Sequence, residues 1–284
     1  MKKRIISITL ALIMAFGSIL LTTVSQGVTS AASGAGASRD AALDAISKVA
    51  ETIEAAEPIR LKLSEIITDE ITGFETEDDS EYDSDEAYEA LEEADGYSAQ
   101  LRDLLSGLNG LPDDPDTSDG KTVLAAREYL TMMLNMTTDL SELIGYSIAF
   151  TDALTILGDM DADTDSYQGL AYTIIVATEA TIEALGQIDP PSYMAISHND
   201  VILRVKELGD FGEDFFSAAM LEDPLRIYSC LYRLDRILRM LTATGENLGA
   251  DLLLQMQQAE RRLHGPIDVL HGELTRNLAI LVEA

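Results

Sequence analysis

Residues 122–157 read TVLAAREYLTMMLNMTTDLSELIGYSIAFTDALTIL, the most apolar of the periodic stretches in this chain. Large apolar residues recur there at three- and four-residue intervals, which predicts one long helix with apolar side chains on most of its faces. Charged residues interrupt the stretch, and a charge near the middle of a bilayer is costly. The pattern therefore favours a central helix of a bundle over a membrane span. The interrupting residues are Arg127, Glu128, Asp139, Glu142 and Asp152.

Helical periodicity continues on both sides of this stretch. We expect further helices over residues 39–74, 85–109, 167–188, 192–220, 224–244, 248–264 and 267–282. Pro58 should kink or end the first of them, Pro190-Pro191 should end the 167–188 helix, and Gly265-Pro266 should break the chain near the C-terminus. Strand signals are nearly absent. The sequence predicts an all-α fold, with one or more antiparallel bundles of about seven helices in residues 39–284. Two sub-bundles meeting near residues 158–166 are the alternative to a single bundle.

The N-terminus has the layout of a secretory signal. Lys2, Lys3 and Arg4 precede an uncharged apolar run, and small residues follow it. We predict a signal peptide over residues 1–32, cleaved near Ala31 or Ala32, and a flexible spacer over residues 33–38. An uncleaved anchor is the alternative, because the apolar run nearly reaches the length of a membrane span. Either reading predicts a secreted, extracellular or cell-envelope protein.

Acidic residues dominate the chain. It holds 19 Lys and Arg against 50 Asp and Glu, a net charge of −31. Such a field repels nucleic acid and anionic membrane surfaces. We therefore expect no nucleic-acid partner, and membrane contact only through an uncleaved N-terminal segment. The partner that we expect is therefore an envelope or extracellular one, whose identity is unknown.

The sharpest local pattern is a run of alternating carboxylates, which could converge on Ca²⁺. The candidate metal ligands are Asp159, Asp161, Asp163 and Asp165. The positions where an EF-hand needs Gly and Glu hold Thr164 and Leu170, so the run is not an EF-hand. The alternative is an acidic loop in which Thr164 or Ser166 caps the next helix.

No catalytic motif is present in the sequence. His198, His264 and His271 lack the Glu three residues earlier that a di-iron bundle uses. Zinc-protease, nucleophile-elbow and phosphate-loop patterns are also missing. We expect no enzyme activity, no catalytic residues and no bound organic cofactor.

Four arginines stand out near the start of the 224–244 helix: Arg226, Arg233, Arg236 and Arg239. They could hold an anion, but pairing with carboxylates of a neighbouring helix is the simpler reading. Met132, Met133, Met136, Tyr129 and Tyr146 could line a pocket, but their helical spacing favours a plain core. Cys230 is the only cysteine, which excludes an internal disulfide, and we expect it to be a packed thiol.

The segment Ile188-Asp189-Pro190-Pro191-Ser192-Tyr193-Met194-Ala195-Ile196-Ser197-His198 resembles a recurring segment of poorly characterised bacterial secreted and lipoprotein-type helical bundles. The resemblance covers residues 188–208. It implies an envelope-associated helical bundle with no activity to carry over. The chain departs from the lipoprotein members because it has no cysteine at the end of its signal segment.

Three functions follow as hypotheses. The first is a non-enzymatic protein that binds an extracellular or envelope partner through its helix faces. The second is a ligand-sensing ectodomain, against which the charged C-terminal helix argues because it cannot form a second membrane span. The third is a bundle that binds Ca²⁺ or another divalent cation through its acidic loops.

Overall fold

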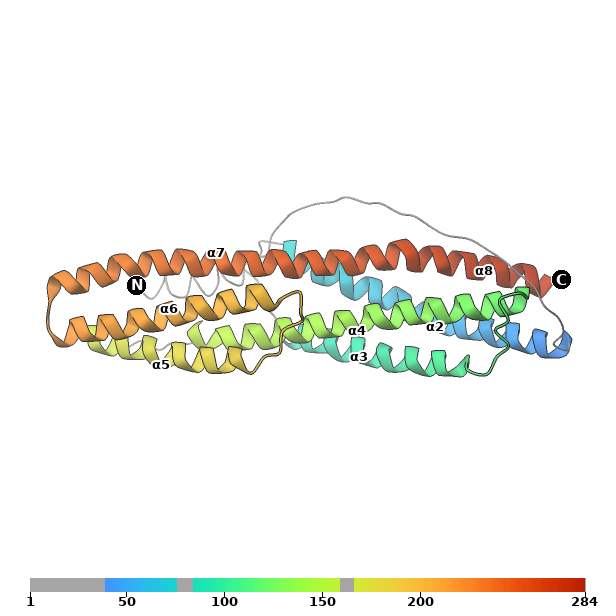
Figure 1. Ribbon diagram of the computed structural model, residues 1–284, viewed down its shortest axis with the longest axis horizontal. Coiled ribbons are helices and arrows are strands. Elements are labelled where there is room, and N and C mark those ends of the chain that lie inside the picture. Colours follow the sequence, from blue (N-terminus) through green and yellow to red (C-terminus); the bar gives the residue numbers. More distant parts are fainter. Residues whose placement is uncertain (1–38, 76–83, 159–165, 284) are drawn as a thin grey trace. The chain divides into compact units, whose positions relative to one another are not determined.

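The computed structural model describes residues 39–75, 84–158 and 166–283, and this part of the chain is helical with no strand. The predicted all-α helical-bundle fold is confirmed. Seven α-helices and one π-helical turn (η1) follow one another in the described residues (Figure 1). They are α2 (Arg39–Glu75), α3 (Ser84–Gly107), α4 (Ser118–Gly158), α5 (Tyr167–Gly186), α6 (Ala195–Met220), α7 (Pro224–Arg262), η1 (Leu263–Ile267) and α8 (Asp268–Glu283).

The described chain forms two compact units. Unit 1 takes in residues 142–255, with the start of α3 as far as Tyr88. Unit 2 takes in α2 as far as Gly73, residues 89–141, and the chain from Met256 onward. Helices α4 and α7 therefore contribute residues to both units. The predicted junction near residues 158–166 lies largely on residues that the structure does not describe, and it stays a prediction.

In unit 1, α5 and α6 form an antiparallel hairpin alongside the end of α4 and most of α7 (Figure 1). The two hairpin helices approach closely at Gly212. A methyl group there would lie 2.9 Å from a side-chain carbon of Ile175, so any larger residue would push the helices apart. Buried Phe211 and Phe215 stack with ring centroids 5.4 Å apart. Stacked aromatic rings add to the stability that apolar burial provides.

The C-terminal part of α7 supplies a regular buried stripe to unit 1. Among its buried positions, five follow steps of three or four residues: Ile237, Leu241, Gly245, Leu248 and Leu252. Steps of four, four and three residues keep side chains on one helix face. The predicted helix end near Thr244 is wrong, because α7 runs unbroken through Gly245, which is buried. Burial of the apolar positions on either side of Gly245 outweighs the weak helix propensity of glycine.

In unit 2, α2, α3, the first half of α4 and the chain from Met256 onward enclose a core of aliphatic side chains. Val49, Leu63, Leu101 and Leu130 are fully buried within it. The chain from Met256 onward adds Met256, Ala259, Leu263, Ile267, Leu274 and Leu278. Thr117 starts α4, where its hydroxyl accepts a hydrogen bond of 3.0 Å from the Gly120 amide. Such a cap satisfies an amide that has no partner inside the helix.

Two prolines of unit 2 lie within helical segments, so Pro58 does not end its helix. Pro58 lies inside α2, which continues for many residues on both sides. The missing N–H costs a helical hydrogen bond, but Ile53, Ala56 and Ile59 around it are buried, and this packing holds the helix together. Gly265-Pro266 falls in η1, which leads directly into α8. The α-helical pattern of α7 therefore ends before this pair, as predicted, while the π turn accommodates the proline ring and keeps the chain helical into α8.

Helix α4 is, within the described residues, the one helix that is long and apolar enough to cross a membrane. Half of its most apolar window is buried inside the protein, and the core helix of a bundle passes the same test of length and composition. Of the predicted core residues, Tyr129, Met133, Met136 and Tyr146 are buried, whereas Met132 is half-buried. Its place at the centre of the packing agrees with the expectation that residues 122–157 form a central helix.

Candidate functional site

The predicted calcium ligands Asp159, Asp161, Asp163 and Asp165 lie outside the described residues, so the calcium site stays a prediction. Ser166, which follows them, caps α5 as one alternative proposed: its hydroxyl accepts a 2.9 Å hydrogen bond from the Gly169 amide. Over the stretches that the structure does describe, no group of three or more His, Cys, Asp or Glu is arranged to hold a metal ion.

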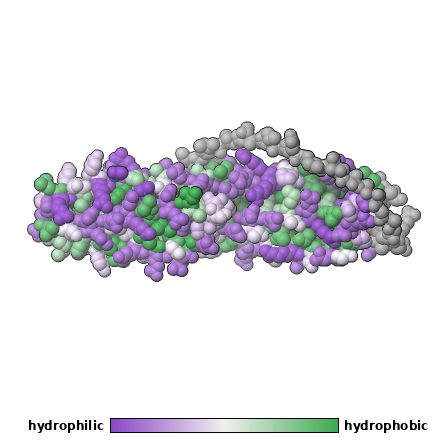
Figure 2. Space-filling view, viewed as in Figure 1, coloured by the Kyte–Doolittle hydropathy of each residue, from purple (hydrophilic) through white to green (hydrophobic). Residues whose placement is uncertain are grey.

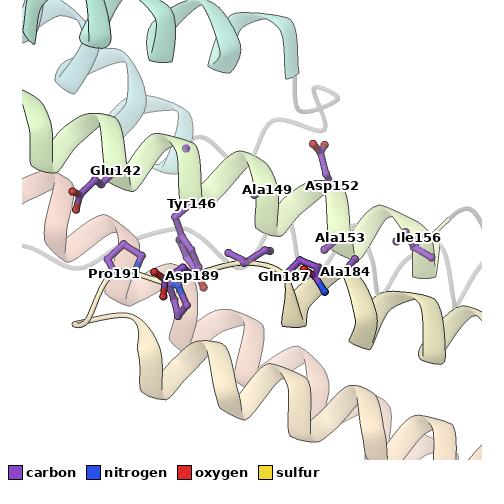
Figure 3. Close-up of a pocket in the computed structure, with 13 residues that line it drawn as sticks. Glu142, Tyr146, Ala149, Asp152, Ala153, Ile156, Ala184, Gln187, Asp189 and Pro191 are labelled. Atoms are coloured by element: carbon purple, nitrogen blue, oxygen red, sulfur yellow. The ribbon is translucent and has the colours of Figure 1, made fainter. Parts of the chain in front are cut away.

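A cleft of about 850 Å³ opens in unit 1 between α4, the end of α5 and the loop that follows it (Figure 3). Small residues on one face of α4 make the room: Gly145, Ala149 and Ala153 are spaced four apart, so a shallow groove runs along the helix. The opposite wall is the loop of Gln187, Ile188, Asp189, Pro190 and Pro191. This wall is part of the segment on which the resemblance to envelope bundles rests.

The charged groups that line this cleft are three carboxylates, those of Glu142, Asp152 and Asp189. All three residues are exposed, and in Figure 3 Asp152 points away from the loop that carries Asp189. The Asp152 carboxylate accepts a 3.1 Å hydrogen bond from the Tyr88 hydroxyl, which raises the pKa of Tyr88. Exposed carboxylates that point in different directions attract cations only weakly, so the cleft is not a built cation site.

His198 lies behind the cleft and is buried, with 3% of its surface exposed. Its Nε2 is 3.2 Å from the Leu185 carbonyl oxygen, and its Nδ1 is 3.2 Å from the Tyr146 hydroxyl. A carbonyl only accepts, so Nε2 carries the hydrogen of the neutral ring and Nδ1 accepts from Tyr146. Burial lowers the pKa of His198, against an opposing effect of the Leu185 carbonyl. The neutral imidazole therefore joins α4, α5 and α6 at one point.

The neighbouring residue extends this link to α7. The Ser197 hydroxyl donates a short hydrogen bond to the Asp251 carboxylate. Residues Ser197 and His198 together thus tie the start of α6 to α4, α5 and α7. The partners of His198 lie on α4 and α5 rather than on its own helix.

The other two histidines belong to a charged cluster in unit 2. Arg60 holds Glu57 through two hydrogen bonds, of 2.9 and 2.7 Å, and Asp268 through one of 2.5 Å. The hydrogen bond to Glu57 is the main cause of the raised pKa of Arg60. His271 lies 3.2 Å from the Glu57 carboxylate, and His264 lies 3.3 Å from that of Asp268. These contacts fasten α8 to α2, so both histidines have structural roles there.

Tyr129 is packed against this cluster. It is fully buried, and its ring centroid is 5.6 Å from that of His271. Its hydroxyl has no hydrogen-bond partner among the described residues. Burial is the main cause of its raised pKa, with the Glu57 carboxylate adding to the effect. The hydroxyl therefore stays protonated and does not take part in the network beside it.

The start of α7 is the most exposed apolar feature of unit 1. No side chain of α7 is buried before Ile237, and Leu225, Tyr228 and Tyr232 are 83%, 78% and 82% exposed. Their spacing of three and four residues places them on one outward face, which Arg236 and Arg239 continue. We call these five residues the α7 face. Figure 2 shows apolar residues among hydrophilic ones at the end where α6 joins α7.

The four arginines near the start of α7 divide into two groups. Arg233 pairs with Asp214 of α6, as the ion-pair reading predicts, while Arg239 pairs with Asp235 of its own helix. Arg226 and Arg236 form no ion pair with any described residue. The sequence reasoning found the arginines but missed Leu225, Tyr228 and Tyr232. The sequence pattern that could have identified these three residues is a second apolar stripe, on the side of the helix opposite the inward stripe of Ile227, Leu234 and Leu241.

The tight turn between α6 and α7 determines where the α7 face begins. The Asp223 carboxylate accepts hydrogen bonds of 3.0 and 3.2 Å from the amides of Leu225 and Arg226. Glu222 before it adopts a positive φ of 50°, which closes the connection from α6 within a few residues. Pro224 occupies the first turn of α7, as predicted. The helix is therefore well anchored at the end that carries its exposed side chains.

Cys230 is half-buried on the inner side of α7. Burial raises the pKa of its thiol, and the Asp214 carboxylate adds to the effect. A thiol with a raised pKa holds little reactive thiolate near neutral pH.

No protein-family model, curated protein or solved structure matches the chain.

Proposed function

We propose that the chain is a non-enzymatic binding protein that works outside the cytoplasmic membrane, and that a partner docks on the α7 face. The exposure of Leu225, Tyr228 and Tyr232 is the observation that carries this proposal. Clustered apolar side chains at a surface are unfavourable in water and commonly mark an interaction site.

The composition of the α7 face supports a protein partner. Tyrosine and arginine are enriched at protein interfaces and at the residues that dominate binding energy. Tyrosine contributes a large rigid surface at low entropic cost. The face also stands on a capped helix, so little ordering is needed when a partner binds.

The non-enzymatic part of the proposal rests on how the histidines are used. His198 is occupied by Tyr146 and Leu185, His264 by Ser64 and Asp268, and His271 by Glu57. None of the three histidines lines the cleft of unit 1, although Tyr146, the partner of His198, does. The location outside the membrane rests on the charged and apolar pattern of residues 1–32.

Photocrosslinking from the α7 face tests the proposal. A benzoylphenylalanine placed at Tyr228 of the full chain, expressed in its native host, should give a discrete crosslinked product. The same group at Tyr172, a 63% exposed tyrosine of α5, is the matched control and should give none. Equal products from both positions, or none from Tyr228, would contradict the assignment of this surface.

Location needs a separate measurement. Cell fractionation combined with N-terminal sequencing should place the chain in the medium or envelope, either cleaved near Ala31 or intact. Recovery of the chain in the cytosol with an intact N-terminus would refute the extracytoplasmic half of the proposal and leave the binding half standing.

A further inference from the structure

We infer that the occupant of the α7 face is a second copy of the same chain, paired antiparallel, α7 against α7. This inference rests on the proposed function and names its partner. It follows from the order of residues along the face: the apolar and aromatic residues come first, at 225, 228 and 232, and the arginines come later, at 236 and 239.

Reversing one copy makes this face complementary to itself. A two-fold axis through Tyr232 sets Tyr232 against Tyr232 of the second copy. It sets Tyr228 opposite Arg236 and Leu225 opposite Arg239, each twice. A guanidinium over a tyrosine ring is attracted to the ring's face, and the arginine stem covers apolar surface. A parallel pairing would instead set arginine against arginine.

The ion pairs already present leave this arrangement free to form. Arg233 is held by Asp214 on the side toward α6, away from the centre of the face. Arg239 pairs with Asp235, but its side chain is 78% exposed, and such a surface pair is weak enough to exchange. Arg236 has no ion pair with a described residue and can contact Tyr228 of the second copy directly.

Charge directs two copies to this face. Each chain carries a net charge of −31, so two copies repel over most of their surfaces. The five residues of the α7 face include no carboxylate, and the reversed pairing sets each of its arginines opposite Tyr228 or Leu225 rather than opposite another arginine. Contact there therefore avoids the repulsion between carboxylates that opposes contact between other surfaces, and self-complementary pairing about a two-fold axis is the commonest form of association.

Salt separates this inference from an anionic partner. Screening weakens the repulsion between two acidic chains, so the dimer should tighten as ionic strength rises. Binding to an anionic surface through the same arginines should weaken instead. Sedimentation equilibrium of the full chain at about 20 mM and about 500 mM NaCl measures this directly.

Two glutamate variants locate the contact. Tyr232→Glu should weaken the dimer by at least ~10-fold, because it places two carboxylates together at the axis. Tyr172→Glu, on exposed surface of α5, should leave association unchanged. Circular dichroism should show equal helicity for both. Equal association of Tyr232→Glu and wild type would overturn the inference.

Cysteine pairs test the register. In a Cys230→Ser background, Tyr232→Cys should form a disulfide-linked dimer with itself, because the axis brings the two positions together. Tyr228→Cys and Arg236→Cys should crosslink when mixed and poorly alone, and Tyr172→Cys should not crosslink. Self-crosslinking of Tyr228→Cys as strong as that of Tyr232→Cys would refute the antiparallel register.

The outcomes distinguish the two proposals. A chain that is monomeric at both salt concentrations overturns the inference. If Tyr228 photocrosslinks to a different protein, the inference fails and the proposed function stands. If no crosslink forms from Tyr228, both fail. A crosslink from Tyr228 to residues 1–38 of its own chain would also overturn the second-copy assignment.

Discussion

Two tyrosines on α4 have the same chemistry and opposite surroundings. Tyr129 in unit 2 and Tyr146 in unit 1 are both buried, and burial raises the pKa of each. The Tyr146 hydroxyl donates to neutral His198, which passes the connection on to α5. The Tyr129 hydroxyl has no partner in the described structure, although Glu57, Arg60 and His271 bind one another beside it.

The difference shows that burial alone does not reveal what a polar group contributes. A hydroxyl that completes a chain of hydrogen bonds stabilises the fold through that chain, and its removal leaves its partner unpaired. A hydroxyl without a partner contributes through its ring alone. Unit 1 should therefore depend on a neutral polar link, whereas unit 2 should depend on aliphatic packing and a charged clamp.

The largest effect should come from His198→Ala. This change removes a buried ring, leaves a cavity beside Phe150 and deprives both Tyr146 and Leu185 of their partner. We expect the free energy of unfolding to fall by about 2–4 kcal/mol, measured by urea denaturation. His264→Ala is the control and should cost less than about 1 kcal/mol, because that ring is about half exposed. Similar losses for both variants would show that the hydrogen bonds of His198 in unit 1 contribute no more to stability than the exposed contacts of His264 in unit 2.

Tyr146→Phe should have the next largest effect. It keeps the ring and leaves Nδ1 of buried His198 without a donor. The expected loss is about 1–2 kcal/mol in the same denaturation experiment. A loss near zero would mean that the hydroxyl contributes as little in unit 1 as Tyr129 does in unit 2.

Acid should weaken unit 1 through His198. Burial lowers the pKa of His198 in the folded chain below its ordinary value of about 6.5. The unfolded chain therefore takes up the proton first, so stability is complete above about pH 6.5 and declines as the pH falls below it. Thermal melting between about pH 7.5 and 5.5 measures this decline. His198→Gln should flatten it, and an unchanged pH dependence in that variant would count against the assignment.

The smallest effect should be that of Tyr129→Phe. The hydroxyl has no protein hydrogen bond to lose, so stability should change by less than about 0.5 kcal/mol. The direct comparison with Tyr146→Phe, under identical conditions, is the sharpest form of the contrast. A loss as large as that of Tyr146→Phe would show that the Tyr129 hydroxyl takes part in the charged cluster after all.

Much of the fold could be predicted from local pattern. The apolar periodicity of residues 122–157 predicts a buried α4, and Tyr129, Met133 and Met136 occupy its core face. Pro190-Pro191 and Pro224 mark a real helix end and a real helix start. These features depend on neighbours in the sequence, so the sequence displays them directly.

The errors share a different cause. The helix end expected near Thr244 is wrong because α7 continues through Gly245, and Pro58 does not end α2. Their local cost is offset by contacts with other helices, which propensity does not record. The partners of His198 were missed for the same reason, because Tyr146 is 52 residues away in the sequence.

The spacing of the buried residues along α7 has one more consequence. Steps of four, four and three residues repeat every eleven residues, or about 3.67 residues per turn, whereas a left-handed zipper needs a seven-residue repeat. An eleven-residue repeat favours a right-handed supercoil instead. Helix α7 should therefore wind with the opposite hand to a leucine zipper where its buried stripe packs against the neighbouring helices.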